Sequence, residues 1–354
     1  MLRRLLHALA LLCAGASLSP HQVQAQGTPL HLKPVKVVAP EWLDVPTATG
    51  IARLAIFVSA AWSMPRPEVT RAVIVIHGIL RNADVYYANA LKARAAGGPD
   101  AASSLMVVPQ FLSDDDAKAH GLGSDTLVWQ RDGWSGGMDA VAPSPVSSFA
   151  ALDAIMAKLA DGVLFPNLSS VVVAGHSGGG QVVQRYAAVG NGESALTARG
   201  IRVRYVVANP SSYLYFTAER PGPEGRLAPF AGAAACPNYN NWKYGFAGGV
   251  PDYVDRTLEA YERRYAGRDV VYLLGTDDVD PNHPLLDKSC MGEAQGPYRY
   301  ARGHWYVAQM QARLAASFTH RLYDVPGVGH EASKMFASAC GLAALFDTAG
   351  CPPQ

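Results

Sequence analysis

The chain has 354 residues, of which 49% are hydrophobic, and its 30 basic and 29 acidic residues almost cancel. This size and composition are typical of one large globular domain and exclude a disordered or fibrous protein. The balanced charge gives no electrostatic reason to expect nucleic acid as a partner.

The N-terminus has the order of a secretory leader. A basic start, Met1 to Arg4, precedes an apolar stretch from Leu5 to Leu18 and a polar region that ends near Ala25. This pattern predicts a signal peptide over residues 1–25 and a secreted or periplasmic mature chain. A membrane span needs about 20 apolar residues and is not expected, because Pro20 and its polar neighbours cut the run short.

The rest of the chain, residues 26–354, alternates between strand and helix patterns. This alternation predicts one α/β domain with a mostly parallel sheet and helices on both faces. Strands are expected over residues 51–60, 72–76, 105–111, 171–174, 203–208, 270–274 and 319–325. Helices are expected over residues 83–96, 147–159, 181–188, 253–264 and 303–316, with a closing helix after His330. Residues 26–41 read as an extended lead-in, and residues 114–116, three consecutive aspartates, are expected in a solvated loop.

A short glycine-rich motif interrupts the pattern after the strand at 171–174. Residues Gly175 to Gly179 read G-H-S-G-G, and a helical pattern follows them. A G-x-S-x-G sequence between a strand and a helix is the pattern of a nucleophile elbow. It presents the hydroxyl of Ser177 at the end of the sheet, where the first turn of the helix directs free N–H groups.

About sixty residues separate the strand at 203–208 from the strand at 270–274. This stretch is rich in proline, glycine and aromatic residues. Loops of this length inside compact domains are usually lids or binding loops, so we expect a cap insertion over about residues 211–266. An aromatic satellite core without substrate contact is the alternative interpretation.

Four cysteines remain after the leader: Cys236, Cys290, Cys340 and Cys351. An even number of cysteines in an exported chain predicts two disulfides. Of the three possible pairings we favour Cys236 with Cys290, which ties the middle segment to a later one, and Cys340 with Cys351, which closes a short C-terminal loop.

A serine nucleophile needs a base, and the base needs a carboxylate to orient it. The strand at 270–274 runs into a turn that carries Asp277, Asp278 and Asp280, and His330 ends a glycine-rich loop after the last strand. The acidic turn lacks the glycine and the distal glutamate of a calcium loop. Since no histidine or cysteine spacing is typical of a metal site either, we expect no metal and no cofactor.

With the elbow, the acidic turn and the histidine loop in this order, the chain resembles the α/β-hydrolase superfamily over most of its mature length. The resemblance implies that Ser177 is the nucleophile, His330 the general base and acid, and Asp278 the orienting carboxylate. Asp277 and Asp280 lie on the same turn and remain alternatives for the acid.

The resemblance also assigns an oxyanion hole. His77-Gly78 follows a strand, at the position from which the superfamily takes a backbone donor. The N–H of Ile79 would pair with that of Gly178, with Leu80 as the alternative to Ile79. His77 and His176 are expected to be packing residues.

One wall of the pocket is expected from residues 129–137. We predict Trp134, Tyr213 and Tyr215 as substrate contacts, and simple packing under loops is the alternative for all three.

The resemblance implies a secreted serine hydrolase that cleaves a carboxylic ester through an acyl-enzyme. Its substrate would be a small-molecule or polymeric acyl compound. A peptidase or amidase and a polymer-degrading hydrolase of the same fold are the alternatives. A binding protein without turnover is a further alternative, although such a protein usually lacks one member of the triad.

Overall fold

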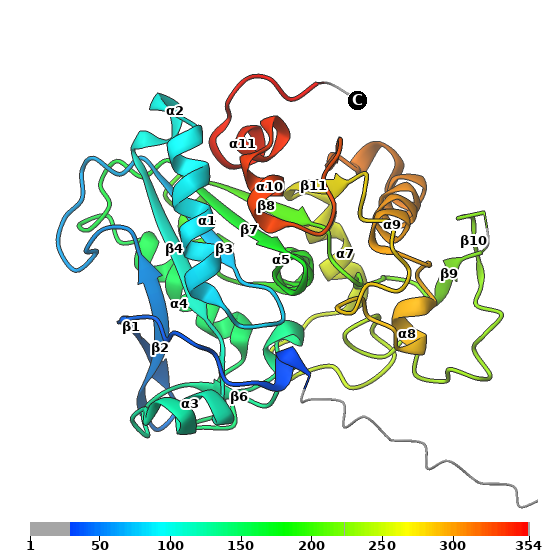
Figure 1. Cartoon of the computed structure of the whole chain (residues 1–354), viewed down its shortest axis with the longest axis horizontal. Helices are drawn as coiled ribbons and strands as arrows, with labels where there is room; N and C mark the ends of the chain where they lie inside the picture. Colours follow the sequence, from blue (N-terminus) through cyan, green and yellow to red (C-terminus); the bar gives the residue numbers. More distant parts are fainter. Residues whose placement is uncertain (1–28, 223, 353–354) are drawn as a thin grey trace, which may run out of the picture.

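The computed structural model describes residues 29–222 and 224–352, so the predicted signal peptide lies outside the described residues. Its main feature is an eight-stranded sheet with the order β1-β2-β4-β3-β7-β8-β11-β12 (Figure 1). The strands are β1 (Glu41–Thr47), β2 (Gly50–Val58), β3 (Arg71–Ile76), β4 (Ser104–Gln110), β7 (Ser170–His176), β8 (Arg202–Ala208), β11 (Asp269–Gly275) and β12 (Arg321–Val325). In this order the six strands from β4 to β12 are parallel to one another, and β2 pairs antiparallel with both β4 and the edge strand β1.

Two small strand pairs lie outside this sheet. They are β5 (Leu112–Ser113) with β6 (Val128–Trp129), and β9 (Glu219–Pro221) with β10 (Leu227–Pro229).

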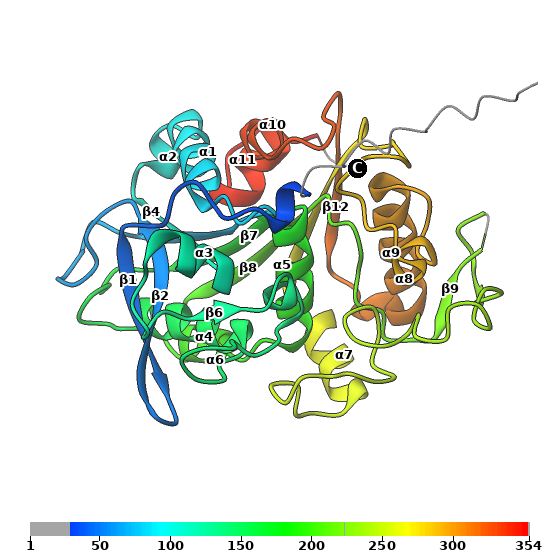
Figure 2. The same ribbon diagram turned by 60° about the horizontal axis from the view of Figure 1, so that its bottom comes forward.

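Helices lie on both sides of the large sheet (Figure 2). The α-helices are α1 (Ala83–Ala96), α2 (Pro99–Ala102), α3 (Asp114–His120), α4 (Ser148–Leu159), α5 (Gly178–Val189), α6 (Glu193–Thr197), α7 (Leu258–Ala266), α8 (Cys290–Glu293), α9 (Arg299–Leu314), α10 (Ala332–Ala337) and α11 (Ala339–Phe346). The short 3₁₀ helices of the described residues are η1 (Leu30–Leu32), η2 (Gly133–Gly136) and η3 (Ala315–Ser317).

The central strands are buried on both faces because side chains alternate along each strand. In β3, Val73 and Val75 pack with residues of α1, α10 and α11, whereas Ile74 and Ile76 pack with residues of α4 and α5 on the opposite face. A strand covered on both sides reads as a continuous apolar run, which is why the parallel strands could be located in the sequence. The predicted fold class is confirmed.

Local capping decides where the helices begin. Ser147 precedes α4, and its hydroxyl accepts a hydrogen bond from the Phe149 N–H at 3.1 Å. Thr257 caps α7 in the same way by accepting from the Ala260 N–H. That cap starts α7 at Leu258, five residues later than predicted from the apolar pattern, since a side-chain oxygen there satisfies a free N–H of the first turn.

The expectation of a solvated loop over residues 114–116 is wrong. These aspartates form the first turn of α3, where Ser113 and Asp116 make a capping box. Acidic side chains are favourable at a helix N-terminus, because they lie at the positive end of the helix dipole. Asp116 is fully buried and paired with Arg81, which is 35 residues away in the chain.

The two disulfides have the favoured pairing. Cys236 is bonded to Cys290, which joins the segment between β8 and β11 to the start of α8, and Cys340 is bonded to Cys351.

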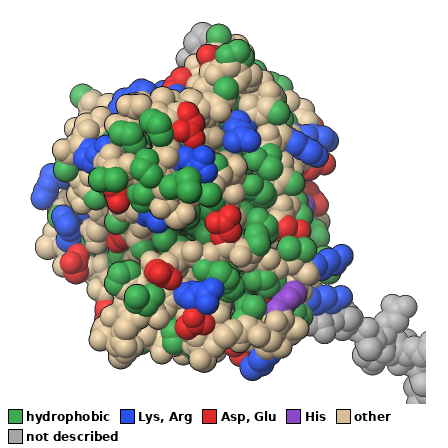
Figure 3. Space-filling model, turned by 90° about the vertical axis from the view of Figure 1, so that its left-hand side faces the viewer, with side chains coloured by type: hydrophobic (Ala, Val, Ile, Leu, Met, Phe, Trp, Pro, Cys, Tyr) green, Lys and Arg blue, Asp and Glu red, His purple; other side chains and the backbone are tan. Residues whose placement is uncertain are grey.

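The described part of the chain contains no helix long and apolar enough to cross a membrane. The surface over β1 and β2 mixes apolar, cationic and anionic side chains (Figure 3).

Candidate active site

Ser177 lies at the sharp turn between β7 and α5. Its backbone has φ 61° and ψ −121°, a conformation that costs free energy for any residue with a side chain. The neighbouring glycines make the turn possible. A Cβ on Gly175 would lie 2.3 Å from the carbonyl carbon of Gly179, and a Cβ on Gly179 would lie 2.1 Å from the Ile76 oxygen. Close backbone packing therefore requires glycine at positions 175 and 179.

His330 connects Ser177 to Asp278. Its Nε2 lies 2.9 Å from Ser177 Oγ, and its Nδ1 lies 2.7 Å from Asp278 Oδ2. Because an ionised carboxylate can only accept, Nδ1 carries the proton and Nε2 is free to accept the proton of the serine hydroxyl. The structure thus brings together the three residues that the sequence order selected.

The acidic turn after β11 packs directly against the loop after β12. A Cβ on Gly275 would lie 2.2 Å from the Val328 oxygen, which also accepts a hydrogen bond from the Asp277 N–H. This contact brings Asp278 close to His330. The other two candidate acids have different partners: Asp277 accepts from Thr276 Oγ1, and Asp280 accepts from the Asn282 N–H.

Arg299, at the start of α9, holds the other oxygen of Asp278. Its Nη1 donates to Asp278 Oδ1 at 3.2 Å and its Nε donates to Ser211 Oγ at 2.8 Å, and its side chain is fully buried. Burial alone would raise the pKa of Asp278, but His330 and Arg299 together hold that pKa below its usual value. Sequence reasoning missed Arg299, because only the fold brings the N-terminal end of α9 beside the acidic turn.

Two further histidines contact the ring of His330. The His176 ring lies 4.5 Å away in a tilted arrangement, and the His283 ring lies 4.9 Å away edge-on. Burial lowers the pKa of His330, and Arg299 and His283 add to this effect, while the hydrogen bond to Asp278 opposes it. The imidazole of His330 is consequently neutral at neutral pH, as a general base must be.

The backbone segments that carry the predicted oxyanion donors lie side by side. A Cβ on Gly178 would lie only 2.9 Å from the Ile79 nitrogen and 3.3 Å from the Gly78 carbonyl carbon. Gly178 is also the first residue of α5, so its free N–H lies at the positive end of the helix dipole. This arrangement can hold a negatively charged oxygen beside Ser177.

His77 holds the chain just before this turn. It is fully buried, its Nδ1 lies 2.9 Å from the Gly78 oxygen, and its Nε2 accepts the Phe111 N–H at 3.0 Å. Burial lowers the pKa of His77 to about 4, so the ring is neutral. Its contacts are those of the packing residue that was expected.

Ser177 lies between two cavities. The larger, about 440 Å³, is also lined by Ile79 and Gly178, and the smaller, about 270 Å³, is also lined by Ile79, Leu80 and His330. Leu285 lines both cavities. A substrate bound at Ser177 thus has room on two sides of the reacting bond.

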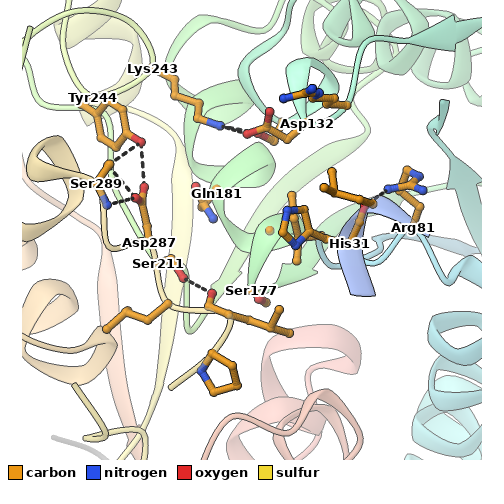
Figure 4. Close-up of a pocket in the computed structure, with 18 residues that line it drawn as sticks. His31, Arg81, Asp132, Ser177, Gln181, Ser211, Lys243, Tyr244, Asp287 and Ser289 are labelled. Carbon is orange, nitrogen blue, oxygen red and sulfur yellow. Dashed lines mark hydrogen bonds and ion pairs between the residues drawn. The ribbon is translucent and has the colours of Figure 1, made fainter. Parts of the chain in front are cut away.

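Four distant segments form the walls of the larger cavity (Figure 4). They supply His31 and Leu32; Arg131, Asp132 and Ser135; Lys243 and Tyr244; and the residues from Pro284 to Asp287 with Ser289. The expected wall at residues 129–137 is therefore present, although other side chains than Trp134 supply it.

Hydrogen bonds join these walls to each other. Lys243 Nζ lies 2.8 Å from Asp132 Oδ2, and the Tyr244 hydroxyl donates to Asp287 Oδ2 at 2.7 Å. The segment between β8 and β11 is therefore tied to both neighbouring walls.

The three aromatic residues predicted to contact substrate lie in the core instead. Trp134, Tyr213 and Tyr215 are at most 1% exposed, and they line neither of the two described cavities at Ser177. Trp134 stacks on Phe111, while Tyr213 and Tyr215 both pack against Tyr306 of α9. The prediction of substrate contact is corrected for all three, because helices and loops that are remote in sequence cover their rings.

No family model matches the sequence, and neither does any curated protein. Among solved structures, the chain is similar to LpqC, poly(3-hydroxybutyrate) depolymerase from Bordetella parapertussis, with a TM-score of 0.58 and 21% identity over 87% of this chain and 90% of that chain. It is also similar to poly(aspartic acid) hydrolase-1 from Sphingomonas sp. KT-1, with a TM-score of 0.55 and 23% identity over 86% of this chain and 96% of that chain. These likenesses establish the fold, which is the α/β-hydrolase fold.

Proposed function

We propose that this chain, with its α/β-hydrolase fold, is an exported serine hydrolase that cleaves a carboxylic ester through an acyl-enzyme. One observation carries the proposal: Ser177 Oγ, the His330 ring and the Asp278 carboxylate form a continuous chain of contacts of 2.9 Å and 2.7 Å at the junction of two cavities. A nucleophile, a base and an orienting acid in contact are the minimum set for acyl transfer.

In the proposed reaction, Ser177 Oγ attacks the carbonyl carbon of the ester while its proton moves to His330 Nε2. The carbonyl oxygen becomes negatively charged and is held by the N–H groups of Ile79 and Gly178. When the tetrahedral intermediate collapses, the bond to the alcohol oxygen breaks and His330 gives its proton to that oxygen. Water then repeats the sequence at the acyl-enzyme, releases the acid and restores the Ser177 hydroxyl.

The positions of His330 and Gly178 favour an orientation of the substrate. His330, which must protonate the leaving alcohol, lines the smaller cavity, and Gly178 lines the larger one. We therefore place the alcohol part of the ester in the smaller cavity and the acyl part in the larger cavity.

We also propose that the mature chain acts outside the cytoplasm. The leader pattern of residues 1–25 and the two disulfides, Cys236–Cys290 and Cys340–Cys351, both support this location, since structural disulfides persist in oxidising compartments.

Labelling with a fluorophosphonate probe tests the catalytic proposal. The folded wild-type chain should form one adduct, located at Ser177 by peptide mass spectrometry, and Ser177→Ala should form none. Folded wild-type protein that does not react with the probe would favour a binding protein without turnover.

A substrate panel tests the ester assignment. p-Nitrophenyl esters of graded acyl length should be hydrolysed with a higher kcat/KM than p-nitroanilide peptides of similar size. The panel should include a polyester film and a soluble polyamide, because the two similar structures carry the names of polymer hydrolases. A preference for the anilides would instead identify an amidase or peptidase.

A further inference from the structure

A segment close to the start of the described chain borders the cavity of the nucleophile. We call residues 29–39 the N-terminal strap, drawn in dark blue in Figures 1 and 2. It contains η1 and continues to β1 without a further helix or strand. Its residues His31 and Leu32 line the larger cavity together with Ser177. A part of the chain more than 140 residues from the elbow thus forms a wall of the candidate site.

Arg81 fastens the strap to the body of the domain. Its Nη1 donates to the His31 carbonyl at 2.7 Å, and its Nη2 donates to the Lys33 carbonyl at 3.0 Å (Figure 4 shows the bond to His31). These two carbonyls flank Leu32, so one guanidinium fixes the stretch of backbone that forms the wall.

Asp116 completes the attachment. Arg81 Nε donates to its Oδ2 at 2.6 Å, and the Val35 N–H of the strap donates to its Oδ1 at 2.8 Å. The side chains of Arg81 and Asp116 are 4% and 0% exposed. A charge buried to this degree is costly unless its partner stays in place, so the network has little freedom to rearrange.

Gln110 adds a second attachment point. Its side chain accepts from the Ala39 N–H at 2.8 Å and donates to the Val37 carbonyl at 3.0 Å. The same side chain donates to the backbone carbonyl of Arg81 at 2.9 Å. The strap is thus held along its length by buried polar side chains whose partners are the backbone of the strap and of Arg81.

Arg81 also belongs to the turn that carries the candidate oxyanion donor. Its N–H donates to the Gly78 carbonyl at 3.0 Å, and this bond closes a turn with Ile79 at its second position. Arg81 has φ 56°, a left-handed conformation that is unfavourable for a residue with a long side chain. Its side-chain bonds to the strap and to Asp116 hold it there and so restrict the position of the Ile79 N–H.

We propose that Arg81 is a positioning residue that fixes the strap wall and the Ile79 turn as one unit, and that His31 and Leu32 determine which acyl groups the larger cavity accepts. The inference rests on the proposed function, because it assigns the larger cavity to the acyl group and the Ile79 N–H to the oxyanion.

The effect on the turn is tested with Arg81→Met. We expect kcat for p-nitrophenyl acetate to fall about tenfold or more, since a displaced donor loses much of its stabilisation of the transition state. The matched control is Arg204→Met, because Arg204 also forms two ion pairs, with Asp269 and Asp347, is partly buried, and lies in β8 outside both cavities. That control should lower Tm and leave kcat and KM unchanged.

The effect on the wall is tested with the double variant His31→Ala/Leu32→Ala. Its ratio of kcat/KM for p-nitrophenyl hexanoate over acetate should fall about fivefold or more, because the longer acyl group loses apolar contact. Leu30→Ala is the matched control: Leu30 is in the same short helix, is 64% exposed and lies outside both cavities. It should keep the wild-type ratio.

The outcomes separate this inference from the proposed function. A wild-type chain without probe labelling or ester turnover contradicts the proposed function itself. The inference is overturned if the wild-type chain is active but Arg81→Met keeps the wild-type kcat. It is also overturned if His31→Ala/Leu32→Ala keeps the wild-type ratio of kcat/KM for hexanoate over acetate. If Arg81→Met does not fold, the double variant Arg81→Met/Asp116→Leu removes both buried charges and allows the same measurement of kcat. The His31→Ala/Leu32→Ala variant tests the role of the strap wall in acyl selection independently.

Discussion

The carboxylate of Asp278 accepts two charged or polar donors, one on each oxygen. His330 Nδ1 contacts Oδ2 and Arg299 contacts Oδ1, so the side chain cannot rotate without losing a bond. The hydrogen bond from Nδ1 fixes the tautomer in which Nε2 faces Ser177.

Asp278→Asn should therefore lower kcat by about 10³ to 10⁴-fold, since the amide can present an N–H to His330 and favour the wrong tautomer. Asp280→Asn is the control on the same turn and should keep activity close to wild type, because Asp280 accepts from the Asn282 N–H. Steady-state hydrolysis of one p-nitrophenyl ester measures both. Activity lost in Asp280→Asn and kept in Asp278→Asn would assign the acid to Asp280.

Arg299 should set the pH dependence of the reaction through His330. The pKa of His330 is lowered from 6.5 by burial and by the Arg299 cation. The base works when neutral, which is the state above its pKa, so kcat/KM should remain high below pH 6.5 before it falls. In Arg299→Gln the loss of the cation raises this pKa, and the acidic limb of the profile should move to higher pH.

Arg299→Lys keeps the positive charge and serves as the control, with an acidic limb close to that of the wild type. Both profiles are measured as kcat/KM between pH 4 and pH 9. An acidic limb in Arg299→Gln that coincides with the wild-type limb would show that Arg299 does not influence the base.

The local sequence was sufficient to identify the site residues that lie on a turn directly after a strand. Ser177, Asp278 and His330 each follow a strand of the parallel sheet, and such strand ends meet at one edge. Burial depends instead on what is packed from elsewhere in the chain, so Trp134 and Tyr213 were misplaced. Arg299 was missed for the same reason.

At the level of elements, the site depends on the contact between the N-terminus of α5 and the turn after β3. Gly178 and Ile79 come so close there that the residue after Ser177 has no room for a side chain. The helix supplies one N–H and the turn supplies the other.

Gly178→Ala should lower kcat by about 10²-fold, because its methyl group would lie 2.9 Å from the Ile79 nitrogen and push the two donors apart. Gly267→Ala is the control, since a Cβ there meets its nearest atom at an ordinary 3.8 Å. The comparison uses kcat for a short ester and Tm. If Gly178→Ala kept the wild-type kcat, the N–H groups of Ile79 and Gly178 would have no role in stabilising the transition state.

Elements next to the buried central strands were predicted well, and elements defined by polar contacts were not. Helix α1 was located to the residue, and its buried residues, Ala83, Tyr86, Ala90 and Ala93, recur at helical spacing between two buried strands. Helix α3 was missed because its capping box and its buried Asp116 look, in sequence, like an exposed acidic run. Strand β1 was missed as well, because it is an edge strand paired only with β2.

In the molecule as a whole, the C-terminal helix is fastened to the sheet at the end opposite the cavities. Asp347, just after α11, accepts from Arg71 of β3 at 2.7 Å and from Arg204 of β8 at 2.6 Å. Burial would raise the pKa of Asp347, but the two arginines lower it below its usual value.

Asp347→Asn should lower the free energy of unfolding by about 1 kcal/mol at pH 7, because the pairs are partly exposed and screened by solvent. A depressed folded-state pKa gives stabilisation that is present above the unfolded value of about 3.9 and is lost as the pH falls through the folded value. The difference in Tm between wild type and variant should therefore be full at pH 7 and shrink below about pH 4. Probe labelling of Ser177 should not change, and a Tm difference independent of pH would contradict the ionic origin.

The disulfide between Cys236 and Cys290 has a consequence for the producing cell. Cys290 directly follows Ser289, a wall residue of the larger cavity, and Cys236 is seven residues before Lys243 on the neighbouring wall. In a reducing cytoplasm the covalent link between these walls would be absent. Under the proposed export, this covalent link between the walls of the larger cavity would form only after the chain has left the cytoplasm.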